Sequence, residues 1–209
     1  MQKGIVGIVA LLSMTGLGLA QGGLGTGPGS LGMAPGAKYP KAKVSFEDFK
    51  GLVNEVEPYR ASRLVDLNTF LKMSKEPGTI ILDSRSTFRF ERIHVKGAKH
   101  LAFTDFTQDA LKQVIPTPQT RILIYCNNNF DGNQTDFPSK VVGFSAKPTI
   151  SPAKQFLSQQ KPLMMALNVP TYINLYGYGY RNVYELDELV NVKDRRITFE
   201  GSIVDQKKP

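Results

Sequence analysis

The sequence predicts an α/β fold with a small central parallel sheet and helices on both faces, and three observations predict it. Two continuous apolar runs, residues 79–82 and 121–125, are typical of strands that are covered on both faces. Segments with helical spacing of apolar residues alternate with them, which is the pattern of parallel strands joined by right-handed crossovers. The chain has 209 residues, 41% of them hydrophobic, which is enough for one sizeable core.

A signal peptide and a Gly-rich linker are predicted to precede this fold. The N-terminus has the order of a Sec-type signal peptide that is cleaved after Ala20. A basic residue, Lys3, comes first, the apolar run at 5–12 follows, and the small residues Gly18 and Ala20 precede the cleavage point. An uncleaved N-terminal anchor is the alternative, although the run is short for a membrane span of about 20 residues. Residues 21–43 are rich in glycine, so we expect a flexible linker there and a periplasmic or secreted protein without a stable membrane anchor.

The folded domain is expected over residues 44–200. Ser45 begins a capping-box pattern before a helix that reaches about Val56, and Pro58 is expected to stop this helix. Apolar runs and helical spacing then alternate along the first half of the domain. The expected elements are a strand at 63–65, a helix at 67–75, a strand at 79–82, a helix at 87–93 and a strand at 99–103.

The second half is expected to begin with a helix over 107–115. The buried strand over 121–125 follows and places Cys126 at its carboxyl end. Residues 127–150 are polar and lack a clear period, and Ser-Pro then suits the start of a helix over 151–160. The remaining expected elements are helices at 163–167 and 170–176, a strand at 182–186, an edge strand at 197–199 and a charged tail at 201–209.

Charge and cysteine content restrict the classes of partner. The formal net charge is +8, but the basic residues are scattered along the chain. Because the protein is also expected to be exported, we expect no nucleic acid as a partner. A basic surface is compatible with small anionic substrates. Cys126 is the single cysteine, which excludes an internal disulfide. In an oxidising compartment, an unpaired thiol is expected to be either buried or functional. The two histidines have no clustered acidic neighbours in the sequence, so neither a metal nor a cofactor is predicted.

Cys126 is the leading candidate for a functional residue. Ligands of open parallel sheets bind beyond the carboxyl ends of the strands, and Cys126 follows such an end. A buried structural cysteine is the alternative. Asparagine tolerates left-handed backbone conformations, so the next residues either cradle an anion with their N–H groups or form a simple turn. These loop residues are Asn127, Asn128, Asn129, Phe130 and Asp131.

Three motifs follow one another across residues 79–186. Asp83-Ser84-Arg85 ends a buried strand, and Phe90 and the segment His94 to Ala98 come after it. A second buried strand then ends in Tyr-Cys at Cys126. The last motif reads Leu-x-x-x-Gly-Tyr-x-Asn-Val-Tyr and starts at Leu175. In order, spacing and strand context, these segments together resemble the rhodanese family.

The resemblance implies a rhodanese-like fold and sulfurtransferase activity. It implies that Cys126 carries sulfane sulfur as a persulfide, taken from a small anionic donor such as thiosulfate and given to a thiol or cyanide-like acceptor. It also implies that backbone N–H groups of residues 127–131 and a helix N-terminus stabilise the sulfur anion. Asp83, Arg85 and His94 are expected to support the site structurally.

Two departures from the family pattern leave a second function open. Asp131 stands where many family loops have Arg, Ser or Thr, and its charge opposes a thiolate if it points inward. The interval from Cys126 to Gly179 is long for the family, which indicates an insertion at about residues 131–165 that covers the site or binds a protein partner. A catalytically inactive rhodanese-like module that binds a protein partner or an anion is therefore the alternative. A cysteine phosphatase would need an arginine a few residues after Cys126, and the sequence has none there. A dithiol oxidoreductase would need a second cysteine, which the sequence does not contain.

Overall fold

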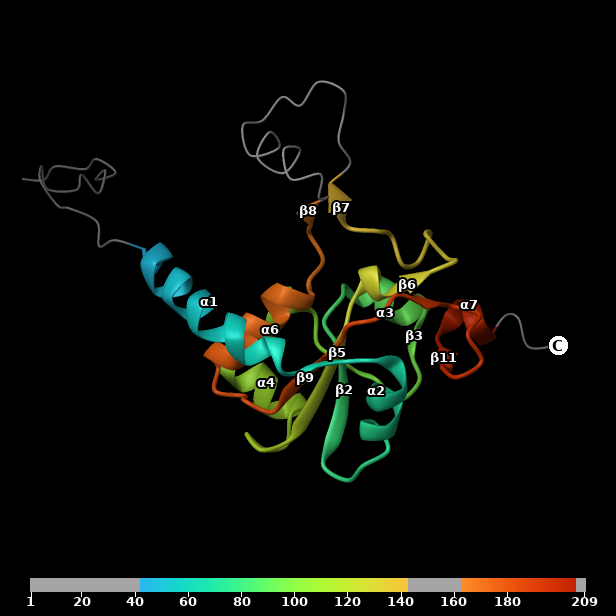
Figure 1. The fold of residues 1–209 in the computed structure, drawn as a ribbon, viewed down its shortest axis with the longest axis horizontal. Helices are drawn as coiled ribbons and strands as arrows, with labels where there is room; N and C mark the ends of the chain where they lie inside the picture. Colours follow the sequence, from blue (N-terminus) through green and yellow to red (C-terminus); the bar gives the residue numbers. More distant parts are fainter. Residues whose placement is uncertain (1–41, 143–162, 206–209) are drawn as a thin grey trace, which may run out of the picture. The chain divides into compact units, whose positions relative to one another are not determined.

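The central sheet has five parallel strands in the order β1-β9-β5-β2-β4, with helices on both faces (Figure 1). The computed structural model describes residues 42–142 and 163–205, so the expected signal peptide, most of the linker and the helix expected at 151–160 lie outside the described residues. β5 is the middle strand, between β9 and β2. The strands are β1 (Leu64–Val65), β2 (Thr79–Asp83), β4 (Lys99–His100), β5 (Arg121–Tyr125) and β9 (Val183–Leu186).

Two apolar clusters form the core, one on each face of the sheet. β5 contributes to both because successive side chains point to opposite faces: Ile122 and Ile124 lie in the first cluster, Leu123 and Tyr125 in the second. Residues of α1, α4 and α6 pack in the first cluster and residues of α2 in the second. These helices are α1 (Phe46–Ala61), α2 (Leu67–Met73), α4 (Gln108–Val114) and α6 (Asn168–Gly177). The predicted fold class is confirmed.

Helix α1 begins as predicted but does not end where the sequence indicated. The Ser45 side chain accepts a hydrogen bond from the N–H of Asp48, as an N-cap does. The expected stop at Pro58 is wrong, because the helix continues to Ala61. Proline removes one helical hydrogen bond, but a contact with the central sheet stabilises the last turn. Arg60 forms a two-point ion pair with Glu185 of β9, with both N–O distances at 2.6 Å.

The segment after residue 162 also differs from the prediction. A helix was expected over 163–167, but β8 (Leu163–Met164) pairs antiparallel with β7 (Val141–Val142). The N–H of Met165 continues this pairing by donating to the carbonyl of Lys140 at 2.6 Å. The apolar residues of this segment are not β-branched and favour a helix locally, whereas the strand depends on a partner that is distant in sequence.

The C-terminal part forms its own small sheet rather than an edge of the central one. β11 (Phe199–Glu200) pairs antiparallel with β3 (His94–Val95), so the expected edge strand at 197–199 is displaced in both position and partner. The segment expected as a charged tail begins with α7 (Ser202–Asp205). Ile203 and Val204 of this helix are half-buried and pack against the second apolar cluster.

Short elements surround the carboxyl end of the sheet. β6 follows the Cys126 turn and pairs parallel with β10. These elements are α3 (Thr87–Arg92), η1 (Phe103–Asp105), η2 (Asn127–Asn129), β6 (Phe130–Asp131) and β10 (Val190–Asn191). Over the two described ranges, none of the helices combines the length and the apolar character that crossing a bilayer requires.

We expect Gly201→Ala to destabilise the C-terminal segment by about 2 kcal/mol. Gly201 has φ +124°, and a Cβ atom there would lie 2.6 Å from the carbonyl oxygen of Arg92. The matched control is Gly51→Ala in α1, where a Cβ atom meets nothing within 4 Å and should stabilise the helix by up to about 1 kcal/mol. Urea unfolding measures both variants. Equal effects of the two substitutions would contradict the close approach at Gly201.

Candidate functional site

Cys126 lies at the carboxyl end of β5, in the middle of the sheet, and it is buried with 1% exposure. Its Sγ atom accepts a hydrogen bond from the backbone N–H of Leu167, with N and S 3.3 Å apart. Leu167 is the N-cap residue of α6, so the positive end of this helix faces the sulfur. The expected helix N-terminus is therefore present at the cysteine, although it comes from a segment 41 residues further along the chain.

The surroundings of the thiol act on its charge in opposite directions. Burial raises the pKa of the Cys126 thiol above its ordinary value, and this effect prevails. The backbone N–H groups of Leu167 and Asn127 work against the shift by hydrogen bonding to the sulfur. The carboxylate of Asp83 raises the pKa of the thiol further, whereas the guanidinium of Arg85 lowers it. The raised pKa favours the neutral thiol in this conformation, although the sulfur lies beside groups that favour its anion.

The loop after Cys126 is a single 3₁₀ turn that leads directly into β6. The Oδ1 atom of Asn129 accepts the N–H of Cys126 at 2.9 Å, and its Nδ2 donates to the carbonyl of Leu186 at 2.7 Å. Asn129 therefore ties the turn to the end of β9. Phe130 pairs with β10 and is buried in the second cluster. Of the predicted loop residues, Asn127 directs its backbone N–H at the sulfur.

Asn128 and Asp131 contact segments outside the cysteine turn. The Oδ1 atom of Asn128 accepts the N–H of Lys140 at 2.7 Å, which links the turn to the chain that enters β7. Asp131 is half-buried on β6, where its carbonyl accepts the N–H of Val192 at 3.0 Å. Its side chain lines a recess together with Gln134 and Ser139. Asp131 thus lines a neighbouring recess, and among the described residues Oδ1 of its carboxylate is buried without a hydrogen-bond partner.

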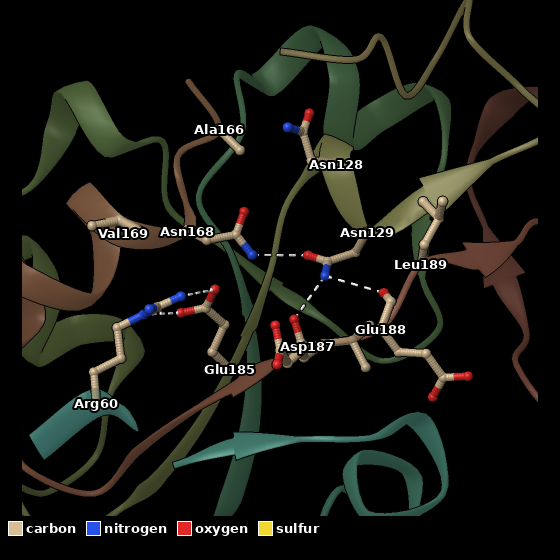
Figure 2. A pocket seen from close by; sticks show the side chains of 11 residues that line it. Arg60, Asn128, Asn129, Ala166, Asn168, Val169, Glu185, Asp187, Glu188 and Leu189 are labelled. Atoms are coloured by element: carbon tan, nitrogen blue, oxygen red, sulfur yellow. Dashed lines mark hydrogen bonds and ion pairs between the residues drawn. The ribbon is translucent and has the colours of Figure 1, made fainter. Parts of the chain in front are cut away.

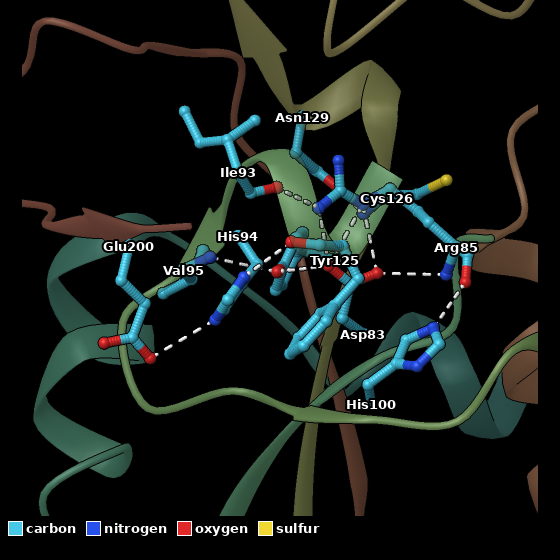
Figure 3. Close-up of polar contacts among 11 residues, drawn as sticks. Asp83, Arg85, Ile93, His94, Val95, His100, Tyr125, Cys126, Asn129 and Glu200 are labelled. Atoms are coloured by element: carbon cyan, nitrogen blue, oxygen red, sulfur yellow. Dashed lines mark hydrogen bonds and ion pairs between the residues drawn. The ribbon is translucent and has the colours of Figure 1, made fainter. Parts of the chain in front are cut away.

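Asp83 and Arg85 form a fully buried ion pair beneath the cysteine (Figure 3). The Nη2 atom of Arg85 lies 2.6 Å from Oδ2 of Asp83 and also donates to the carbonyl of Ile93 at 2.7 Å. Tyr125 joins the pair, since its hydroxyl donates to Asp83 at 2.6 Å and accepts the N–H of Val95 at 3.0 Å. Tyr125 is not among the predicted site residues; its polar hydroxyl at the end of an apolar strand was the available signal.

His94 and Cys126 belong to separate parts of the network. The Nδ1 atom of His94 is hydrogen-bonded to the carbonyl of Phe90 at 2.7 Å, and its Nε2 lies 3.2 Å from Oε1 of Glu200 (Figure 3). The imidazole also stacks on the ring of Phe90, with centroids 3.7 Å apart. His94 thereby joins α3 to β11. The other histidine, His100, is hydrogen-bonded to the carbonyl of Arg85 at 2.9 Å.

Several buried polar atoms next to Cys126 lack a hydrogen-bond partner. In the part of the chain that the structure describes, these include Nη1 of Arg85, Oδ1 of Asn127 and Oδ1 of Asn168. Most buried polar groups in folded proteins are paired, so unpaired ones call for an explanation, of which a functional role is one. The clustering around one thiol marks this end of the sheet as a candidate site.

A pocket of about 300 Å³ adjoins the cysteine turn (Figure 2). The Nδ2 atom of Asn168 donates to Oδ1 of Asn129 at 2.8 Å, and both residues line the pocket. Two further lining residues, Ala166 and Asn168, flank Leu167, whose N–H is bonded to the sulfur. The pocket is lined by Arg60, Asn128, Asn129, Ala166, Asn168, Val169, Glu185, Leu186, Asp187, Glu188 and Leu189.

Comparison with known proteins bears on this arrangement. Residues 66–147 match the family model of the Rhodanese-like domain, a range that contains Asp83, Arg85 and Cys126. The crystal structure of the BH2092 protein from Bacillus halodurans is similar with 15% sequence identity and a TM-score of 0.35, covering 75% of this chain and 86% of that chain. None of the curated proteins compared with the chain gives a match. The chain contains a rhodanese-like domain at residues 66–147.

Proposed function

We propose that this protein is an exported sulfurtransferase in which Cys126 carries sulfane sulfur from a donor such as thiosulfate to a thiophilic acceptor. One observation carries the proposal. The single thiol stands at the carboxyl end of the central strand and accepts the N–H of Leu167 at the start of α6, 3.3 Å away. A helix N-terminus aimed at a cysteine favours its thiolate and anions bound to it.

The proposed reaction has two steps. In the first, the Cys126 thiolate attacks the outer sulfur of thiosulfate, a new S–S bond forms, and sulfite leaves with the electron pair of the broken bond. In the second, an acceptor thiolate attacks the outer sulfur of the persulfide, and Cys126 leaves as a thiolate that regains a proton. The N–H groups of Leu167 and Asn127 and the charge of Arg85 favour the anionic sulfur at both stages.

We infer that the conformation with a covered sulfur is the closed form of such a site. With 1% exposure of Cys126, a donor reaches the sulfur only if the segment before α6 moves. At the start of this segment the side chain of Met165 is 59% exposed, and its backbone is held by one hydrogen bond to the carbonyl of Lys140. We propose that displacement of residues 165–167 exposes the sulfur, and that their return places the N–H of Leu167 on it again.

Intact mass spectrometry after incubation with thiosulfate tests the proposal. We expect the wild-type protein to gain the mass of one sulfur atom, to lose it on addition of a thiol or cyanide, and to do so with release of sulfite. Cys126→Ser should show none of these changes, while its far-UV circular dichroism stays that of the wild type. A wild-type protein that never gains sulfur, at any pH at which it stays folded, would refute sulfur transfer.

A catalytically inactive binding module is the second candidate function. The observation that favours it is the burial of Cys126 together with the raised pKa of its thiol, since a neutral, covered sulfur is a poor nucleophile. For such a module we expect no sulfur adduct, and we expect Cys126→Ser to keep the binding of a protein partner or an anion unchanged.

A further inference from the structure

One carboxamide joins the segment that carries the thiol to the segment that covers it. The Oδ1 atom of Asn129 accepts the backbone N–H of Cys126 at 2.9 Å, and the same atom accepts Nδ2 of Asn168 at 2.8 Å. Figure 2 shows the two asparagine side chains facing each other along this second bond. Asn168 is the first residue of α6 and directly follows Leu167, whose N–H is bonded to the sulfur. The start of the helix is therefore tied to the backbone of the cysteine itself.

Asn129 is also attached to the central sheet. Its Nδ2 atom donates to the carbonyl of Leu186, the last residue of β9, at 2.7 Å. Three segments thus meet on one buried side chain: the turn after β5, the end of β9 and the start of α6. Because Asn129 is held by the first two, it cannot follow Asn168 if the start of α6 moves away from the sheet.

The side chain of Asn168 does little for its own helix. Asparagine is favoured at the N-cap, where its oxygen accepts an N–H group of the first turn. In α6 the N-cap residue is Leu167, and no side chain caps the helix. Among the described residues, Oδ1 of Asn168 is buried without a hydrogen-bond partner. A buried amide with one unpaired end contributes little net stability, so its bond to Asn129 calls for a reason other than stability.

The next attachments of α6 lie three and four residues further along. The hydroxyl oxygens of Thr171 and Ser84 are 2.7 Å apart in a buried hydrogen bond just beyond the end of β2. The hydroxyl of Tyr172 donates to the carbonyl of Val183 in β9 at 3.0 Å. These bonds keep the body of the helix on the sheet when its first residue is released. The segment that can move by breaking the bond of Asn168 is therefore short.

We propose that the hydrogen bond from Asn168 to Asn129 is a latch, which holds the N–H of Leu167 on the sulfur and sets how often reagents reach Cys126. Leu167 and Asn168 are consecutive, with Cα atoms about 3.8 Å apart, so the covering N–H cannot move far while the latch is closed. Asn168 acts through Leu167 and is a positioning residue. The effect of the latch on sulfur loading rests on the proposed sulfurtransferase function, whereas its effect on access does not.

Removing the donor of the latch should make the sulfur more accessible in the folded protein. We expect Asn168→Ala to be alkylated by iodoacetamide about fivefold faster than the wild type, the factor that corresponds to one net hydrogen bond. Because attack follows opening, loading from thiosulfate should accelerate by the same factor. Oδ1 of Asn129 keeps the N–H of Cys126 in this variant, so no further buried group loses its partner. Intact mass measures both rates.

A second variant separates the hydrogen bond from the volume of the side chain. Asn168→Leu fills the space of the amide but has no donor, and it should also be alkylated faster than the wild type. If Asn168→Leu reacted at the wild-type rate while Asn168→Ala reacted faster, lost packing would be the cause, and the latch would be overturned. Neither substitution introduces a poor helix former at the start of α6.

The matched control is Tyr172→Phe, which removes a buried hydrogen bond of the same helix beyond the latch. We expect this variant to unfold at lower urea concentration than the wild type, yet to be alkylated and loaded at the wild-type rates. Below the unfolding transition, the alkylation rates of the Asn168 variants should stay nearly independent of urea. Equal acceleration in Tyr172→Phe would mean that general stability controls access to the sulfur, which would contradict the latch.

Alkylation needs no sulfur donor, so it separates this inference from the proposed function. If both Asn168 variants are alkylated faster but the wild-type protein never gains sulfur, the sulfurtransferase is refuted and the latch stands. If the wild type gains sulfur but the Asn168 variants are alkylated at its rate, the latch fails alone. If alkylation accelerates in these variants and loading does not, the donor reaches Cys126 by another opening, and the proposed control of loading is overturned.

Discussion

Arg85→Met is expected to destabilise the domain by about 3–5 kcal/mol, because it leaves the Asp83 carboxylate buried without its partner. Asp83 is completely buried, and Arg85 donates to it from its backbone N–H, from Nε and from Nη2. Tyr125 supplies one further donor, which does not compensate a full charge. Urea unfolding followed by circular dichroism gives the free energy of unfolding of each variant.

The control for this prediction removes both charges. In Asp83→Asn/Arg85→Met no uncompensated charge remains, so the double variant should lose less stability than Arg85→Met alone. A loss below about 1 kcal/mol for Arg85→Met would mean that water or another group reaches the carboxylate of Asp83 when Arg85 is absent.

The sequence was most informative where structure depends on local composition. The apolar runs at 79–82 and 121–125 became β2 and β5, since strands covered on both faces need continuous apolar residues. The position of Cys126 followed directly from β5. The order of three motifs anticipated the rhodanese-like domain, which the match over residues 66–147 confirms.

The predictions failed where a distant partner decides the conformation. α1 continues through Pro58 because Arg60 reaches Glu185, 125 residues further along the chain. β8 forms because β7 offers its backbone, whereas its own residues favour a helix. The hydrogen bond from Leu167 to the sulfur joins residues 41 positions apart. Neither the hydrophobic periodicity nor the motif spacing of a single segment indicates contacts between residues so distant in sequence.

The candidate site was predicted from the sequence, but its electrostatics could not be predicted in the same way. A pattern that ends in Tyr-Cys gives the position of the thiol, whereas burial decides its pKa. Likewise Asp131 was the acidic residue that the sequence placed near the sulfur. The structure turns Asp131 to another recess and brings Asp187 and Glu188 to the neighbouring pocket through the end of β9. The carboxyl ends of parallel strands meet at one edge of the sheet, so side chains from distant segments come together there. The residue pattern of one segment does not show which side chains of other segments it will meet.

Alkylation of Cys126 by iodoacetamide at pH 8 should be at least about a hundredfold slower in the folded protein than in the urea-unfolded chain. Burial at 1% exposure restricts access, and the raised pKa of the thiol reduces the thiolate fraction. Because the folded pKa lies above the unfolded one, native alkylation should keep rising with pH after the rate of the unfolded chain has levelled. With one cysteine in the chain, intact mass reports this residue alone.

The urea dependence of the same rate distinguishes how the sulfur becomes exposed. Movement of residues 165–167 alone exposes little new surface, so native alkylation should be nearly independent of urea well below the unfolding transition. If the sulfur is reached only by global unfolding, the rate should instead rise exponentially with urea, with the slope of the equilibrium transition. That outcome would contradict local opening, and with it the access that sulfur transfer requires, because an enzyme cannot unfold in every cycle. A flat dependence would establish that the covering segment opens while the sheet, and the buried pair of Asp83 and Arg85, stay intact.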